Sequence, residues 1–210
     1  KYKKPLFFYH VPKCAGTTFS VLLSHLVNRN HRISGALFEN NDKGGQTAYE
    51  NYIKNENLIN SSNLDFLYGH VPFEIHSELR NDYIFATILR EPIQRCISHY
   101  VWGLNRGYFS PNEKLADLFN KNKLQKNVLV NQFSGKGLSK PNDDESVDLS
   151  YKNLVNSIDF IFDVEETFKL LNLIISSYNF SNLFFQNQQV LNKKIIISDK
   201  DIDIIKKHND

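Results

Sequence analysis

The 210 residues fit a single domain over residues 1–210, and a chain of this length buries roughly 70% of the surface that it exposes when unfolded. With 41% hydrophobic and 23% charged residues the composition is globular, and a net charge of +2 gives no overall field to attract nucleic acid or an anionic membrane. Two cysteines exclude a disulfide framework, and no His or Cys spacing suggests a metal site.

No apolar run approaches the roughly 20 residues that span a bilayer, so we expect no transmembrane segment in this chain and favour a cytoplasmic location. The sequence contains no Met, and removal of a leader or anchor would instead fit a lumenal, Golgi-type location.

Strand and helix patterns alternate along the chain. Strands are expected at Leu6–His10, Leu64–Tyr68, Tyr83–Leu89 and Ser157–Phe162. Helices are expected at Thr17–Val27, Glu91–Leu104 and Val164–Tyr178. Residues 28–63 turn polar, residues 134–146 are expected to form a loop, and the Asn- and Lys-rich end is undetermined. The alternation predicts an α/β fold, a three-layer sandwich with a mainly parallel sheet.

The loop after the first expected strand has the composition of an anion site. It reads V-P-K-C-A-G-T-T over residues 11–18 and leads into a helix, whose first N–H groups lack internal partners and whose dipole favours negative charge. Ala15 and Gly16 let a phosphate approach the backbone, Thr17 and Thr18 add hydroxyl donors, and Lys13 adds a positive charge. An ordinary turn with a Thr N-cap explains the same residues, so both interpretations stay open at this point.

A second stretch follows the expected strand at 83–89. Arg90 lies at its carboxyl end, where open α/β sheets bind ligands, and a planar guanidinium suits phosphate. Ser98 lies about two turns into the next helix. Taken alone, a surface ion pair for Arg90 and a solvated Ser98 explain this stretch more simply.

Both stretches resemble one family. Residues 10–19, HVPKCAGTTF, resemble the 5′-phosphosulfate-binding loop of the carbohydrate sulfotransferases related to heparan sulfate 2-O-sulfotransferase, which typically reads H-I-P-K-T-A-G-T-T. Residues 89–100 resemble the family's 3′-phosphate motif, L-R-[DE]-P-x-x-R-x-x-S-x-Y. Cys14 departs from the pattern by replacing a Thr. Asn131–Gly135 resembles a later helix of the family, and the likeness spans roughly residues 6–178.

The resemblance implies a P-loop-kinase-like sulfotransferase fold that binds PAPS (3′-phosphoadenosine 5′-phosphosulfate) as donor and releases PAP, without a metal. Lys13 would contact the sulfate-bearing phosphate, and the cradle would comprise Ala15, Gly16, Thr17 and Thr18. Arg90 and Ser98 would bind the 3′-phosphate. Arg95 fits a structural ion pair as well as a site role.

Sulfuryl transfer to an alcohol requires removal of a proton, and histidine has a suitable pKa. His70 follows Gly69 at a strand end and resembles the family's G-H-[VF] element, in which the His is the proposed general base. Any one of the seven histidines is more often structural than catalytic. His76 is a weaker candidate for substrate contact.

Three aromatic residues, Tyr100, Trp102 and Tyr108, could stack on sugar rings, although aromatic residues near a helix more often belong to the core. The sequence gives no indication of the oligomeric state.

The sequence therefore predicts a PAPS-dependent sulfotransferase with His70 and Lys13 as catalytic residues, acting on a hydroxyl group of a carbohydrate or another acceptor. The first alternative, a nucleotide or sugar kinase, would need magnesium ligands and a Walker A loop, and in this loop the Lys precedes the Gly. The second is a non-catalytic nucleotide-binding protein, against which the joint presence of Lys13, His70, Arg90 and Ser98 argues.

Overall fold

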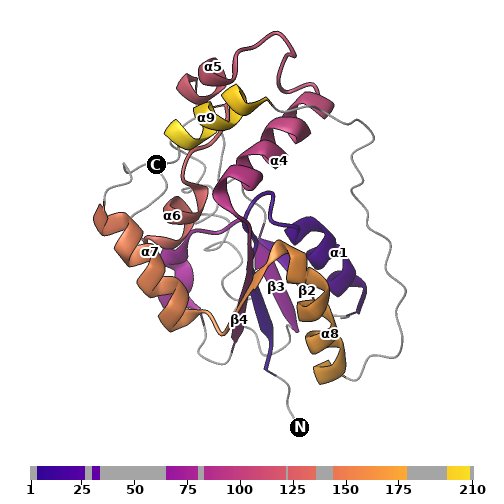
Figure 1. The fold of residues 1–210 in the computed structure, drawn as a ribbon. Coiled ribbons are helices and arrows are strands. Elements are labelled where there is room, and N and C mark those ends of the chain that lie inside the picture. Colours follow the sequence, from indigo (N-terminus) through magenta and orange to yellow (C-terminus); the bar gives the residue numbers. More distant parts are fainter. Residues whose placement is uncertain are drawn as a thin grey trace.

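The computed structural model describes residues 4–26, 30–33, 65–79, 83–121, 123–135, 144–178 and 198–208. Its centre is a five-stranded sheet in the order β2-β3-β1-β4-β5, in which every neighbouring pair is parallel (Figure 1). The strands are β1 (Leu6–Tyr9), β2 (Asn30–Ile33), β3 (Phe66–Gly69), β4 (Ile84–Leu89) and β5 (Phe160–Asp163). The predicted α/β class with a parallel sheet is confirmed.

Helices lie on both faces of this sheet, which gives the predicted three layers. One face carries α1 (Gly16–Leu26) and α8 (Thr167–Tyr178), which follows the short η2 (Val164–Glu166). The other face carries η1 (Phe73–Glu78), α6 (Val128–Phe133) and α7 (Asp144–Ser157) (Figure 1). A third group lies beyond the carboxyl edge of the strands and comprises α4 (Pro92–Asn105), α5 (Leu115–Asn120) and α9 (Asp199–Lys207).

The central position of β1 explains its continuous apolar sequence. Successive side chains of a strand point to opposite faces, and helices cover both faces here. Phe8 packs against Phe19 of α1, with 4.3 Å between ring centroids, whereas Tyr9 packs against Phe133 of α6 on the opposite face at 5.6 Å. Helices on both faces of the sheet therefore support the carboxyl end of β1.

Several elements differ from the sequence-based expectation. The strand β2 was not predicted, and the expected loop at 134–146 overlaps the start of α7 at Asp144. The expected strand at 157–162 begins only at Phe160, because α7 continues through Ser157. Residues 34–64, 136–143 and 179–197 lie outside the described residues. None of the described helices is long and apolar enough to cross a membrane.

The helices beyond the strand ends have their own apolar cluster. Cys96 of α4, Phe119 of α5 and Ile205 of α9 are fully buried in it. The helix α9 begins with a capping box between Ser198 and Asp201, which fixes its first turn. This packing holds α4, the helix that follows the second sequence motif, over the carboxyl edge of the sheet.

Candidate functional site

The loop between β1 and α1 has an unusual backbone. Lys13 and Ala15 have φ values of 69° and 55°, in the left-handed region that non-glycine residues seldom occupy. Alternation of left- and right-handed residues turns successive N–H groups toward one point, which forms an anion-binding concavity. The amino terminus of α1 begins directly afterwards at Gly16. The predicted cradle at 15–18 therefore coincides with a strained turn and the start of an 11-residue helix.

Gly16 is required by a close approach of a neighbouring side chain. A Cβ atom placed on Gly16 would overlap the imidazole ring of His10. His10 is buried, and its ring lies against that of His70 with 4.1 Å between centroids. The absence of a side chain at Gly16 thus makes room for a pair of histidines beside the loop.

His70 is oriented by a hydrogen bond to the same strand end. Its Nδ1 lies 2.7 Å from the backbone carbonyl oxygen of His10. A carbonyl oxygen only accepts, so Nδ1 must carry the proton, and in the neutral ring Nε2 then carries the lone pair. The residue predicted as base is therefore held at the start of the loop between β1 and α1, in the tautomer that a base requires.

Arg90 connects the end of β4 to the loop. Its Nη1 donates to the carbonyl oxygen of Lys13 over 3.4 Å, so two residues predicted to bind the donor lie together. Glu91 caps α4 by accepting hydrogen bonds from the backbone N–H groups of Ile93 and Gln94 at 3.1 and 2.8 Å. Ser98 lies half-buried on α4, and among the described residues it makes no hydrogen bond to Arg90 or Lys13.

The Lys13 ammonium occupies a cationic environment. Its Nζ lies 4.9 Å from the ring centroid of Trp102. Burial, followed by the charges of Arg90, Arg106 and Arg95, lowers the pKa of Lys13 to about 8. A bound anion would relieve this repulsion, so the site favours an anionic ligand.

Arg95 contributes a buried charge behind the loop. Only 2% of its surface is exposed, and its Nη2 donates to the Gln125 carbonyl oxygen at 2.9 Å and to the Cys96 sulfur at 3.1 Å. Within the described part of the chain Arg95 has no carboxylate partner, and its Nη1 is unpaired. The structural ion pair considered for Arg95 is thus not found among the described residues.

Two further side chains that the sequence analysis named, Cys14 and His76, make packing contacts. Cys14 is fully buried in the core cluster, and burial raises its pKa to about 12, so the thiol stays neutral near pH 7. His76 lies 3.0 Å through Nδ1 from the Tyr9 hydroxyl and stacks on Phe73 at 4.7 Å. The Nδ1 side of the half-buried His76 is therefore engaged in packing against β1 and η1, and its contact with substrate stays a prediction.

One neighbouring residue that the sequence did not single out is His99. Burial, followed by the charges of Arg95 and Lys13, lowers its pKa to about 3, so the ring is neutral near pH 7. In the sequence, only its position next to Ser98 pointed to His99. The low pKa of His99 results from burial and from charges that the fold brings close to it.

The arrangement is that of P-loop-like α/β proteins, in which anionic ligands bind where a parallel sheet meets the amino terminus of a helix. The sulfotransferase family matches residues 1–190, so the chain belongs to this family, whose members transfer sulfuryl groups. A comparison with curated proteins finds no match. The described residues contain no group of three or more His, Cys, Asp or Glu side chains placed to hold a metal ion.

Proposed function

We propose that the protein transfers a sulfuryl group from PAPS to a hydroxyl group of a carbohydrate, with His70 as general base. One observation carries the proposal: the hydrogen bond of His70 to the His10 carbonyl ties the base to the phosphate-binding loop. The transferred group and the acceptor proton can then be handled within one site.

The proposed reaction is a direct in-line displacement. His70 Nε2 takes the acceptor hydroxyl proton while the acceptor oxygen forms a bond to sulfur. The bond between sulfur and the bridging 5′-phosphate oxygen breaks, and PAP leaves with the electron pair on that oxygen. Lys13 and the first N–H groups of α1 stabilise the charge that develops there.

We assign the 3′-phosphate of the donor to the segment that leads from the end of β4 into α4. Arg90, beside the loop at the end of β4, would bind the 3′-phosphate together with Ser98. A guanidinium can offer two parallel N–H groups to a phosphate, which gives orientation as well as affinity. Because protein cations surround the proposed phosphosulfate position, we expect PAP binding to persist when a chelator removes metal ions. Because ATP lacks a 3′-phosphate for Arg90 and Ser98, we expect PAP to bind more tightly than ATP.

The test is transfer from ³⁵S-labelled PAPS to a pool of unsulfated polysaccharides, comprising chondroitin, heparosan and chitin oligosaccharides. The base is tested with His70→Asn, whose side-chain N–H can still donate to the His10 carbonyl but which lacks Nε2. We expect single-turnover transfer to slow roughly 10²–10⁴-fold with PAP affinity retained.

His208→Asn is the matched control, because His208 stacks on Phe119 beside α9, in another apolar cluster. A folded His70→Asn protein that transfers at the wild-type rate would remove His70 from the mechanism. Failure to bind PAP in calorimetry would refute the donor assignment itself.

A further inference from the structure

Trp102 lies in the last turn of α4, and Tyr108 follows the end of this helix. Neither residue has a role in the proposed sulfuryl transfer. The rings of Trp102 and Tyr108 lie 5.2 Å apart at an interplanar angle of 35°. Tyr108 is 63% exposed, although aromatic residues near a helix were expected to belong to the core. A large aromatic side chain held at the surface beside a second ring is a typical surface for ligand contact.

The segment that carries Tyr108 is firmly positioned. Gly107, with φ 74°, turns the chain back after α4, and the Tyr108 N–H donates to the Gly103 carbonyl oxygen at 2.9 Å. Next to it, Phe109 is buried directly against Gly103, where a Cβ atom would overlap its ring. Tyr108 is therefore exposed while its backbone is fixed on both sides.

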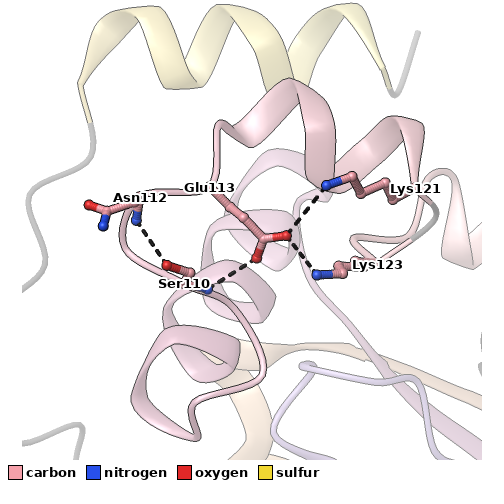
Figure 2. Close-up of polar contacts among 5 residues, drawn as sticks. All are labelled: Ser110, Asn112, Glu113, Lys121 and Lys123. Atoms are coloured by element: carbon pink, nitrogen blue, oxygen red, sulfur yellow. Dashed lines mark hydrogen bonds and ion pairs between the residues drawn. The ribbon is translucent and has the colours of Figure 1, made fainter.

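The rest of this loop is anchored by one carboxylate (Figure 2). Glu113 accepts from the Ser110 backbone N–H at 3.1 Å and from Lys123 Nζ at 2.6 Å, while Lys121 Nζ lies 3.8 Å away. The Asn112 N–H donates to the Ser110 hydroxyl at 3.3 Å. The loop after Tyr108 is thus closed onto the chain beyond α5.

Lys13 covers one ring of this pair, since its Nζ lies over the Trp102 ring, 4.9 Å from the centroid. A cation–π contact of this kind is weak compared with an ammonium–phosphate contact. The nearby charges of Arg90, Arg95 and Arg106 further disfavour the ammonium there. A phosphosulfate in the loop should therefore draw Lys13 away from Trp102.

We propose that Trp102 and Tyr108 form the subsite that packs against a sugar ring of the acceptor, and that Lys13 covers this subsite until the donor binds. The subsite rests on the proposed function, because it needs a carbohydrate acceptor and a phosphosulfate donor. The donor thus exposes the acceptor subsite by taking up the lysine that covers it.

Trp102 is the sole tryptophan of the chain, so its fluorescence reports this contact directly. Titration with PAP should change the emission of the wild-type protein with the same midpoint as calorimetric binding. In Lys13→Met, which has no ammonium to move, saturating PAP should leave the emission unchanged. An unchanged wild-type emission at calorimetric saturation, or an equal change in Lys13→Met, overturns the covering role of Lys13.

The sugar contact is tested by Tyr108→Ala in the transfer assay with the same polysaccharide pool. We expect the acceptor KM to rise about threefold to tenfold, the worth of one aromatic contact, with PAP affinity and the fluorescence response retained. Tyr151→Ala is the matched control, because Tyr151 is 67% exposed on α7, on the opposite side of the sheet from α1 and α8.

The outcomes separate this inference from the proposed function. An unchanged KM in Tyr108→Ala, or an equal rise in Tyr151→Ala, overturns the sugar subsite while transfer itself stands. If PAP binds but no polysaccharide is sulfated, both the carbohydrate acceptor and this subsite are refuted. If PAP does not bind, the donor assignment fails, and the inference fails with it.

Discussion

The low pKa of Lys13 makes donor affinity depend on pH in a defined window. In the free protein the pKa is about 8, because burial and three arginines disfavour the ammonium. A bound phosphosulfate or phosphate favours the ammonium, so the pKa in the complex must be higher. PAP affinity is therefore highest below pH 8 and falls as pH rises from about 8 through the pKa of the complex.

The size of the effect follows from the contact that Lys13 makes. A hydrogen bond to a charged group contributes about 1.5–3 kcal/mol, and one pKa unit corresponds to about 1.4 kcal/mol. The pKa in the complex should then lie about one to two units above that of the free protein. PAP affinity should fall about three- to sixfold per pH unit near pH 9 and level off after a total loss of roughly 10- to 160-fold.

Calorimetry between pH 7 and 10 measures this loss, and two buffers of different ionisation enthalpy measure proton uptake. At pH 9 binding should take up roughly 0.5–0.8 proton. Lys13→Arg should bind with almost constant affinity over this range, because a guanidinium does not titrate there. A flat wild-type profile, or the same decline in Lys13→Arg, would refute the reasoning.

Three other perturbations test separate parts of the site. Arg90→Ala should weaken PAP by about 1.5–3 kcal/mol in calorimetry but leave 5′-AMP, which lacks the 3′-phosphate, almost unaffected; equal losses would show a misassigned residue. Gly16→Ala should lower the free energy of unfolding by about 1–3 kcal/mol through overlap with the His10 ring. Chemical denaturation should show that His10→Ala reduces this cost, and additive costs would contradict the overlap. Cys14→Thr should leave PAP affinity within about twofold of wild type, because residue 14 faces the core, and a tighter complex would place it in the cradle.

The sequence predicted a strand well where helices bury both faces of that strand. The run at Leu6–His10 predicted β1 almost to the residue, because a central parallel strand is apolar throughout. The helix α7 was missed, since its exposed Val147 and Tyr151 and its polar neighbours give no clear apolar stripe. The helix α9 was not predicted because it has few apolar residues. The residues that bury its Ile205 come from α4 and α5, far away in the sequence.

The sequence by itself determined the family and pointed to the loop between β1 and α1 as the candidate anion site, because both depend on local residue order after a strand. The tertiary structure decided what these residues face. It turned Cys14 into the core, set His76 against the buried Tyr9, and brought His70 to the His10 carbonyl 60 positions away. Such pairings depend on which strands are neighbours in a parallel sheet, and helical or strand periodicity within one segment carries no information about them.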